Sequence, residues 1–379
     1  MSKLKIAIFT PYNIFKAGGV QEHVTEQARL LRARGHNVTI LTPRPVGVAN
    51  DGAPEGYVFL GGSTRIKAPH ATSADVSISI DNDAIDEELK KGYDVLHVHE
   101  PMVPIAARQL LARAEGHALR VGTFHAALPG NMLGKSLVAG YKTYARTILP
   151  MVDVISAVSP AAVGYIEEFT DKKIHYIPNG VNLKNYKLST RRRDESMIVS
   201  INRLEKRKGP LQIIKAFDYL KRELRPDAKL IMVGDGPMRS TLEQYVHDYQ
   251  VQDVTFTGFI DEQEKLDLLS SCSVATYPSL YGESFGIVLV EAMAKGAPIV
   301  AHPNDGYAWV LKETGRVGLV NCKNDEAYAH RLQLMMEDQG VRALWQTWAK
   351  KYVKQFDYEK IVDAYEELYH ANKYVDVKD

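Results

Sequence analysis

Short apolar runs alternate with longer helical patterns along the chain, and this alternation limits its possible folds more than any other feature. The first instance runs from an apolar segment at 6–10 through a helical pattern at 21–34 to a second apolar segment at 38–42, with Gly35 ending the helix. This order predicts a strand, a helix and a strand. Strands that are apolar throughout belong to a parallel sheet with helices on both faces. We therefore expect a doubly wound α/β fold.

The same rhythm occurs in two halves of the chain, separated by helical patterns such as 210–224 and 284–295. The further predicted strands are 95–99, 120–124 and 154–158 in the first half, and 197–202, 229–233, 254–256, 274–277 and 298–301 in the second. Between the halves, the polar stretch 184–194 has the composition of a domain hinge. A chain of 379 residues fits two domains. We predict an N-terminal domain over 1–183 and a C-terminal domain over 184–356.

Composition excludes several classes of protein and partner. Lys and Arg number 47 against 46 Asp and Glu, and this balance argues against nucleic acid as the main partner. The two cysteines, Cys272 and Cys322, are too few for a disulfide framework and favour a reducing, cytoplasmic location. No stretch of about 18 apolar residues exists, so we expect no spanning helix, while contact with a membrane surface stays open.

Ligands of doubly wound sheets bind outside the carboxyl ends of the strands, and two facing domains make one cleft. The first loop of this kind, 11–20, ends in Gly18 and Gly19, whose amides at a helix start can receive a phosphate. The spacing is not the dinucleotide fingerprint, which disfavours a nicotinamide cofactor. A plain turn that uses glycine remains the alternative.

Three histidines lie in or directly after two later predicted strands of the first half. His97 and His99 share one face of a strand, but zinc would need a third ligand, and no nearby motif supplies one with recognisable spacing. In the alternative, His97 is buried and hydrogen-bonded, while His99 and Glu100 lie at the cleft rim. His125 could donate to a substrate hydroxyl or phosphate, and a structural role is equally open.

Two cations follow the first strand of the second half. Arg203 lies at the strand end and Lys208 just before a helix that Pro210 starts, so both can converge on a diphosphate. A solvated charge run is the alternative. Gly234 begins a turn, 234–237, for which we suspect a binding role.

The segment 277–294 is the most informative of the chain. A strand ends there, a glycine-containing loop carries Glu283, and a helix begins whose first amides face the same space. Glu291 lies eight positions later, about two helical turns, and so stays near the loop. A carboxylate accepts hydrogen bonds from two sugar hydroxyls at once, so the pair suits the hexose and the ribose of a nucleotide sugar. A surface role would not explain Glu291 in such an apolar helix.

Taken together, these residues resemble the family 4 retaining glycosyltransferases of GT-B fold. The matching pieces are Gly18-Gly19-Val20, Thr123-Phe124-His125, Ile177-Pro178-Asn179-Gly180-Val181, Arg203 with Lys208-Gly209, and Glu283 to Glu291. Within the family, the segments around Gly19 and Glu283 look especially like the bacterial phosphatidylinositol mannosyltransferases, which use GDP-mannose. The resemblance implies two Rossmann-like domains facing a central cleft, with a C-terminal helix over 357–379 packing back on the first domain.

The resemblance also implies roles for single residues, and it implies neither a metal nor a cofactor. The implied catalytic residues are His125, Arg203, Lys208 and Glu283. The implied donor contacts are Gly18, Gly19, Arg203, Lys208, Gly234, Ile260, Asp261, Glu262, Glu283, Phe285, Gly286, Ile287, Val288 and Glu291, with Asp261 or Glu262 pairing with guanine. The acceptor-side residues would be Tyr12, His99 and Lys135.

The acceptor is the least constrained part of this interpretation. A helical pattern over 132–149 interleaves apolar residues with Lys135, Lys142 and Arg146, so it predicts a basic amphipathic helix that could lie on anionic lipid at the inner face of the cytoplasmic membrane. An apolar face packed on the sheet is the alternative. The loop 13–17 lacks the acid expected near an inositol, which keeps a different lipid or a soluble sugar alcohol open.

Three other functions compete with this one. The first is a UDP-sugar-dependent glycosyltransferase with a soluble acceptor. The second is a non-catalytic nucleotide-sugar-binding protein, which the presence of both cations and both glutamates disfavours. The third is an epimerase or phosphorylase, disfavoured because epimerases carry a different set of acids and phosphorylases a cofactor lysine and a longer chain.

Overall fold

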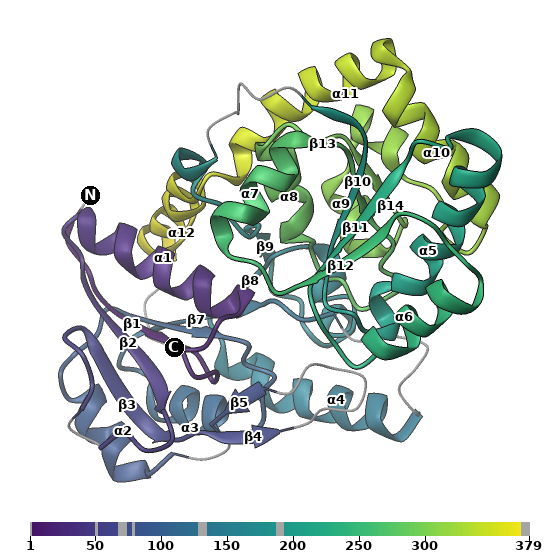
Figure 1. Ribbon diagram of the computed structural model, residues 1–379. Coiled ribbons are helices and arrows are strands. Elements are labelled where there is room, and N and C mark those ends of the chain that lie inside the picture. Colours follow the sequence, from purple (N-terminus) through teal and green to yellow (C-terminus); the bar gives the residue numbers. More distant parts are fainter. Residues whose placement is uncertain are drawn as a thin grey trace. The chain divides into compact units, whose positions relative to one another are not determined.

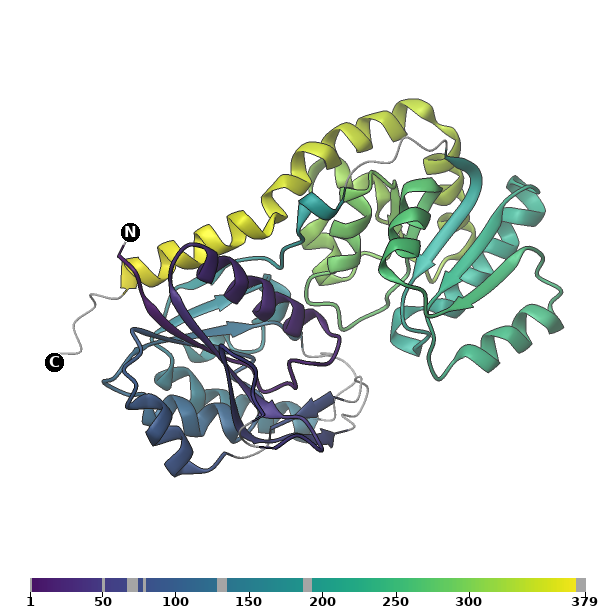
Figure 2. The same cartoon turned by 60° about the vertical axis from the view of Figure 1, so that its left-hand side comes forward.

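The computed structural model describes residues 2–49, 52–66, 74–77, 80–127, 135–186 and 193–372, with only the backbone at 65, 66, 74, 75 and 135–138. The chain forms two compact units, each with its own sheet (Figures 1 and 2). Unit 1 combines residues 1–180 with 358–379, and unit 2 consists of residues 181–357. Unit 1 is therefore built from two separate stretches of sequence.

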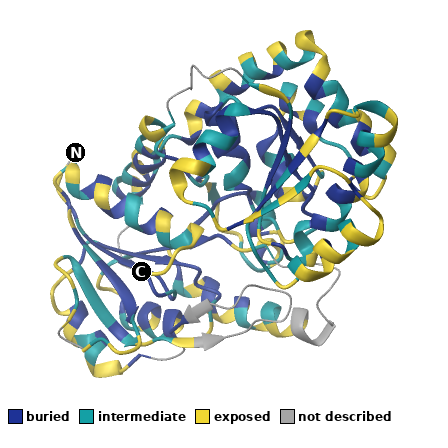
Figure 3. Cartoon of the chain, in the orientation of Figure 1, coloured by how far each residue is buried: buried dark blue, intermediate teal, exposed yellow. Residues whose placement is uncertain are grey.

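Unit 1 contains a seven-stranded sheet in the order β3-β2-β1-β6-β7-β8-β9, and every neighbouring pair is parallel. The strands are β1 (Lys5–Phe9), β2 (Asn37–Arg44), β3 (Tyr57–Gly62), β6 (Val95–His99), β7 (Leu119–Phe124), β8 (Val154–Ala157) and β9 (Ile174–Tyr176). A separate antiparallel pair joins β4 (Thr64–Ile66) to β5 (Ala74–Val76). Strand β6 is buried throughout and β1 is buried except at Lys5, as expected for the centre of a sheet covered on both faces (Figure 3).

Helices cover both faces of this sheet. They are α1 (Gly19–Ala33), α2 (Asn82–Leu89), α3 (Ala106–Arg113), α4 (Lys135–Ile148) and α12 (Tyr358–Asn372). The C-terminal helix α12 lies beside α1 in both views, with α2, α3 and α4 on the opposite face (Figures 1 and 2). Apolar residues of α1, α12, β1, β2, β6 and β7 form one buried core, which removes apolar surface from water and so stabilises unit 1.

Charged groups fix the register of α12 against α1. The Arg34 guanidinium, at the end of α1, pairs with Glu366 at 2.9 Å and with Asp363 at 2.7 Å. His36 Nε2 lies 3.0 Å from the second oxygen of Glu366, and its Nδ1 accepts the Leu4 amide. Helix α12 is thus bonded to residues at the junction of α1 and β2.

Unit 2 contains a five-stranded parallel sheet in the order β12-β11-β10-β13-β14. The strands are β10 (Asp194–Ile201), β11 (Lys229–Val233), β12 (Val254–Gly258), β13 (Cys272–Tyr277) and β14 (Ile299–Ala301). The helices are α5 (Pro210–Tyr219), continued by a π-turn at Leu220–Leu224, α6 (Arg239–Asp248), α7 (Glu262–Ser271), α8 (Ile287–Ala294), α9 (Asp305–Val310), α10 (Asp325–Glu337) and α11 (Gln339–Tyr352). Both sheets are parallel and helix-covered, so the predicted fold class is confirmed.

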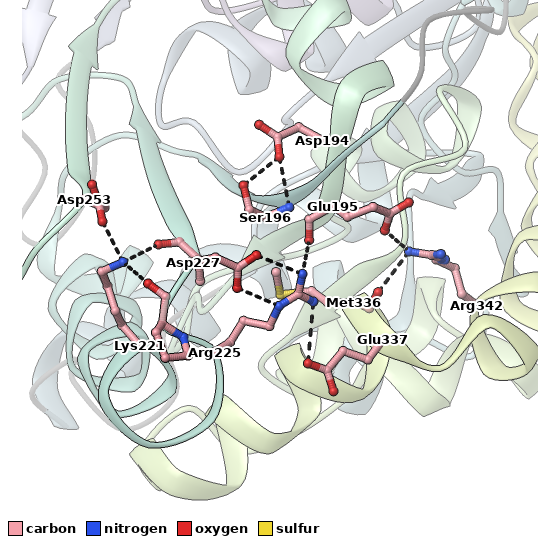
Figure 4. A network of polar contacts seen from close by, with 12 residues as sticks. Asp194, Glu195, Ser196, Lys221, Arg225, Asp227, Asp253, Met336, Glu337 and Arg342 are labelled. Carbon is pink, nitrogen blue, oxygen red and sulfur yellow. Dashed lines mark hydrogen bonds and ion pairs between the residues drawn. The ribbon is translucent and has the colours of Figure 1, made fainter.

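An ion-pair network lies at the amino ends of the strands of unit 2 (Figure 4). The Arg225 guanidinium, 16% exposed, pairs with Asp227 at 3.0 Å and Glu337 at 3.6 Å. Lys221 pairs with Asp253 at 2.6 Å. Several partners are largely exposed, and each such pair contributes about 0–1 kcal/mol. The network marks the end of the sheet opposite to the loops considered below.

The structure differs from the predicted elements at a few places. It adds β3 and β9 at the two edges of the first sheet, which the sequence pattern missed. Helix α8 begins at Ile287, three residues later than predicted, because Gly286 adopts a φ of +105° and interrupts the helix there. Much of the predicted hinge, 187–192, and the start of the predicted amphipathic segment, 132–134, lie outside the described residues.

Candidate functional site

The loops that follow β10 and β13 in unit 2 are packed tightly against each other. Gly209 has a φ of +66°, and a Cβ there would lie 2.3 Å from the Pro278 carbonyl oxygen. The Leu280 amide donates to the Arg207 carbonyl at 2.7 Å. A Cβ on Gly306 would lie 2.3 Å from the Glu283 carbonyl oxygen. Small residues therefore allow three stretches of backbone to meet, and their close approach fixes the position of Glu283.

Glu283 is held by two cations. Its Oε1 accepts hydrogen bonds from Lys208 Nζ at 2.5 Å and from Arg207 NH1 at 2.9 Å. The side chains of Glu283 and Lys208 are only 10% and 13% exposed. Charge-assisted bonds of this kind are the strongest that side chains make, and partial burial protects them from screening by salt. The structure thus brings together Lys208 and Glu283, which the sequence predicted to share a site.

Arg203 does not join this cluster. Its side chain is 46% exposed and pairs with Glu205 at 3.1 Å. Arg207 also pairs with Glu205 at 3.1 Å and so links Glu205 to Glu283. The second cation beside Glu283 is therefore Arg207, which sequence reasoning missed. Arg203 is linked to Glu283 only indirectly, through Glu205 and Arg207.

Glu291 is buried inside unit 2 and carries its own partners. Lys265 of α7 donates to its Oε1 at 2.8 Å, and the Tyr186 hydroxyl donates to the same oxygen at 3.2 Å. Burial raises the pKa of Glu291, although Lys265 opposes the rise. Lys265 also pairs with Glu262 at 2.9 Å. Glu291 thus lies in the apolar helix as a paired carboxylate, with one oxygen engaged.

Several other predicted donor contacts have structural tasks. Asp261 caps α7 by accepting the Glu264 amide at 2.8 Å, and Glu264 reaches back to the Asp261 amide. The Phe285 side chain is buried against Trp309 and Phe356. Any contact of Phe285 with a donor would therefore use its backbone.

The turn after β11 is shaped by close backbone contact. Gly234 has a φ of +119°, and a Cβ there would lie 2.2 Å from the Asn202 carbonyl oxygen. Next to the cap of α7, Ile260 is partly buried, while Phe259 is 80% exposed and presents its ring to solvent. Ile287 and Val288 form the first turn of α8 after Gly286.

In unit 1, the loop after β1 leads into α1 through two glycines. Helix α1 starts at Gly19, and Gly18 at the N-cap position makes no side-chain cap. A Cβ on Gly19 would meet nothing within 4 Å, so the first turn of the helix is open on that side. The amides of a first helical turn have no partner inside the helix, which makes this end suitable for an anion.

The predicted histidines lie in a buried hydrogen-bond network of unit 1. His99 Nδ1 lies 2.8 Å from His125 Nε2, and His99 Nε2 lies 3.1 Å from Gln27 Oε1. His97 Nδ1 contacts the Tyr369 hydroxyl at 2.7 Å, and its Nε2 contacts Thr123 at 2.6 Å. Burial holds the pKa values of His97, His99 and His125 well below the ordinary value, so these rings are neutral.

Glu100 holds the loop that carries His125. Its Oε1 accepts the amides of His125 at 2.5 Å and Ala126 at 2.6 Å. Glu100 has a φ of +55°, an uncommon conformation for a residue other than glycine, and burial raises the pKa of its carboxyl to about 7. Tyr12 is partly buried nearby, and burial together with the charge of Glu100 raises the pKa of its phenol.

Two family models match the chain: Glycosyltransferase Family 4 over residues 17–185 and Glycosyl transferases group 1 over residues 184–352. The phosphatidyl-myo-inositol mannosyltransferase of Mycolicibacterium smegmatis is 30% identical over 94% of this chain and 91% of its own length. The N-acetyl-alpha-D-glucosaminyl L-malate synthase of Bacillus anthracis is 26% identical over 97% of both chains. A glycosyltransferase of Rickettsia africae superposes with a TM-score of 0.78 at 19% identity, over 99% of this chain and 100% of the other.

The chain belongs to glycosyltransferase family 4. It is a hexosyltransferase of the retaining type with a GT-B fold. None of the helices described here is both long and apolar enough to cross a membrane.

Sequence reasoning on this family 4 glycosyltransferase missed residues whose partners are far away in sequence. Lys265 lies 26 positions before Glu291, and Gln27 lies 72 positions before His99. No spacing rule links such pairs. Arg207 carried a signal, since it is one of three consecutive basic residues, but only the turn at Lys206–Lys208 decides which of them face Glu283.

Proposed function

We propose that this family 4 glycosyltransferase moves mannose from GDP-mannose to a hydroxyl of a phosphatidylinositol-type lipid or a related polyol. The observation that carries the proposal is Glu283 with its two cations, Lys208 and Arg207, on a loop fixed by glycines. The mannosyltransferase relative, which matches nearly the whole chain, supports the choice of sugar and lipid.

In this proposal, Lys208 and Arg203 stabilise the negative charge that develops on the diphosphate during the reaction. When the nucleoside diphosphate leaves, negative charge grows on its phosphate oxygens while the anomeric carbon becomes cationic. Lys208 and Arg203 stabilise the diphosphate, together with the amides at Gly18 and Gly19. Oriented donors need no rearrangement during the step, and each is worth about 2.7–4 kcal/mol in enzymes where one was removed. The leaving phosphate accepts the proton of the acceptor hydroxyl, which arrives on the same face.

The two glutamates accept hydrogen bonds from hydroxyl groups of the donor. Glu283 accepts from the hexose through Oε2, since Oε1 bonds the two cations. Glu291 accepts from the ribose through its second oxygen, because its Oε1 bonds Lys265 and Tyr186. Glu262 pairs with the guanine edge, because the Asp261 carboxylate already caps α7. His125 lies near the reacting carbon, with Tyr12 and His99 towards the acceptor.

A panel of donors tests the sugar and the base. GDP-mannose, UDP-glucose and UDP-N-acetylglucosamine are each added to the protein while its thermal unfolding is recorded. Binding to the native state stabilises it by about 2.7 kcal/mol at a hundredfold excess over Kd. We expect GDP-mannose to give the largest shift, and labelled mannose to appear in phosphatidylinositol. A larger shift with a UDP-sugar, or no transfer, would contradict the proposal.

One specific pair of observations favours a second candidate, transfer of N-acetylglucosamine from its UDP-sugar to a soluble acceptor. The Bacillus anthracis relative bears the name of an N-acetylglucosaminyl malate synthase and matches 97% of this chain. The loop 13–17 also contains no Asp or Glu, so it offers no acid to an inositol ring. Transfer assays with malate and with phosphatidylinositol, run side by side with both donors, separate the two candidates.

The helix α4 bears on membrane contact. Lys142 pairs with Glu168 and lies 5.7 Å from the centre of the Phe169 ring, which Arg146 approaches at 4.8 Å. Ala145 and Ile148 are buried, so the apolar face of the described part of α4 packs within unit 1. The side chain of Lys135 lies outside the described residues.

Contact of α4 with anionic lipid remains part of the proposal and is tested by co-sedimentation. Wild type should pellet with anionic vesicles in a salt-sensitive manner. A triple glutamine variant at Lys135, Lys142 and Arg146 should stay in the supernatant. Equal sedimentation of both, or none of the wild type, would favour a soluble acceptor.

A further inference from the structure

Three buried histidines from three elements of unit 1 meet at one point. His23 comes from α1, His99 from the end of β6, and His125 from the loop after β7. One ring nitrogen of each lies within 4.8 Å of the others. His23 and His99 are fully buried, and His125 is 6% exposed. No spacing in the sequence connects these residues, so this cluster becomes visible only in the fold, and it contains His99 but not His97.

His23 is the unexpected member of this cluster. Neither of its ring nitrogens makes a hydrogen bond to any residue that the structure describes. The ring instead contacts His125, Tyr358 and Tyr365, with centroids 5.1–6.1 Å away. Buried polar atoms in native proteins almost always have a partner, so an exception requires an explanation. A cation shared with the neighbouring rings would supply one.

The hydrogen bonds around His99 prepare it as a ligand. His99 Nε2 donates to Gln27 Oε1 at 3.1 Å, because Gln27 Nε2 is used as a donor to the Tyr369 hydroxyl at 2.8 Å. The lone pair of His99 is therefore on Nδ1, which points into the cluster. Protein metal sites commonly fix their histidines in this way, with the outer ring nitrogen donating to an oxygen.

We propose that His23, His99 and His125 form a binding site for a divalent transition metal, with Zn²⁺ as the ion that fits best. Zinc binds three histidines at about 2.0–2.1 Å each and keeps a fourth position open, so tetrahedral ligand nitrogens lie about 3.4 Å apart. The nitrogens of this cluster range from 2.8 Å between His99 and His125 to at most 4.8 Å. Small movements of the rings, apart for the pair at 2.8 Å and together for nitrogens further apart than about 3.4 Å, would bring all three nitrogens to that separation.

Binding moves one proton. In the hydrogen-bonded arrangement, His125 Nε2 donates to the bare Nδ1 of His99. To bind a metal through Nε2, His125 must carry its proton on Nδ1 instead. Asn179 neighbours His125, and its buried Oδ1 has no aligned hydrogen bond to any described residue, so it is available as the new acceptor.

The metal would inhibit the enzyme. His125 is the histidine proposed to lie near the reacting carbon, and a metal would take up its Nε2. Binding itself does not depend on the proposed function, because it follows from the cluster alone. Only the inhibition rests on the role proposed for His125, so the two parts can fail separately.

The experiment titrates metal-free full chain with zinc by calorimetry against a competing chelator, and with Co²⁺ by visible absorption. Wild type should bind one equivalent at the cluster, with a cobalt spectrum typical of tetrahedral nitrogen ligands. His23→Phe keeps a ring against Tyr358 and Tyr365 but removes one ligand. It should weaken zinc binding at least about 100-fold. His247→Ala, which removes a histidine 84% exposed in unit 2, is the control and should bind as wild type does.

The outcomes are distinct. No zinc uptake by wild type, or equal affinity in His23→Phe, would overturn the site. If His23→Phe does not fold by circular dichroism, X-ray absorption of zinc-loaded wild type still counts the imidazole ligands, and fewer than three overturns the site. Tight binding without reversible loss of transfer would preserve the site and overturn the inhibition.

Discussion

The buried and half-buried polar side chains of the two units differ in their charge. In unit 1, the side chains of the buried network are neutral: histidines, Gln27 and tyrosines bonded to one another, with the Glu100 carboxyl beside them bonded to two backbone amides. In unit 2, the groups are charged and paired, as Glu283 is with Lys208 and Glu291 with Lys265. A neutral network costs little to bury once all its members are satisfied, whereas a charge needs an opposite charge beside it.

The difference indicates what each region can do. A cation of an ion pair can also bond a charged ligand when one enters, and this property suits a diphosphate. Neutral rings provide directed donors and acceptors but no net field, which suits hydroxyl groups. The unit 2 cluster should therefore respond to the loss of a single charge far more strongly than the unit 1 network responds to the loss of one amide. The following predictions test that ranking.

The largest effect is expected at the buried pair of Glu291 and Lys265. Among the residues that the structure describes, Glu291→Ala leaves Lys265, which is 17% exposed, with the exposed carboxylate of Glu262 as its remaining ion-pair partner. Breaking a buried pair by removing one partner costs about 3–5 kcal/mol. Denaturant unfolding measures this loss. Glu262→Ala removes a side chain that is 64% exposed and should cost less than about 1 kcal/mol, and an equal loss in the two variants would refute the pairing.

The second effect concerns catalysis. Lys208→Ala and Glu283→Ala should each lower kcat about 10²–10³-fold, the cost of removing one oriented partner of the transition state. The fold should survive, because both residues lie on loops after strands. Lys206→Ala changes an exposed residue of the same loop and serves as the matched control. Near-normal turnover in either variant would mean that the donor site lies elsewhere.

The third effect is a pH dependence of the docking of α12. Burial would raise the pKa of Glu366, but hydrogen bonds from His36 and Arg34 outweigh burial, and the net pKa lies below its ordinary value of 4.5. A carboxyl with a lowered pKa in the folded state contributes stability above its unfolded pKa and loses it as the pH falls through the folded pKa. We therefore expect α12 to detach more readily in acid, below about pH 4.5.

Hydrogen exchange of α12 as a function of pH measures this detachment. Glu366→Gln should weaken the pH dependence and cost about 1.5–3 kcal/mol at neutral pH, the value of a charge-assisted hydrogen bond. Glu367→Gln, one residue away and exposed, is the control. An unchanged pH profile in Glu366→Gln would assign the pH dependence to other groups, such as the Asp363 carboxylate that also pairs with Arg34.

The smallest effect is expected in the neutral network. Gln27→Leu leaves the His99 Nε2–H group buried without its acceptor, which costs about 1–3 kcal/mol. The cost should not change with salt concentration, because no net charge is lost. Arg29→Ala, on the exposed side of the same helix, should cost at most about 1 kcal/mol. A salt-dependent loss in Gln27→Leu would show that the network carries charge.

The fold could be predicted from the sequence because apolar strands and helical patterns are local signals. All five strands of unit 2 were predicted to within three residues at each end. The edge strands β3 and β9 were missed because an edge strand is exposed on one side and need not be apolar throughout; β9, with only three residues, has no fully buried residue.

Only part of the candidate site could be predicted from the sequence. The loops that carry Lys208 and Glu283 were found because they follow strands, which is a property of the sequence. Arg207, Lys265 and His23 were missed, because their partners meet them through packing. Whether the predicted residues contact a donor remains a prediction that the variants above test.

The discontinuity of unit 1 has a consequence for synthesis of the protein. The ribosome makes β1 and α1 before unit 2, but helix α12, which packs against α1, follows only after all of unit 2. Domains tend to fold as they emerge, so unit 2 can complete its interior while an apolar face of unit 1 still awaits residues 358–372. This part of unit 1 is made before unit 2 but completed after it, and until then an apolar surface of the chain stays exposed to other molecules.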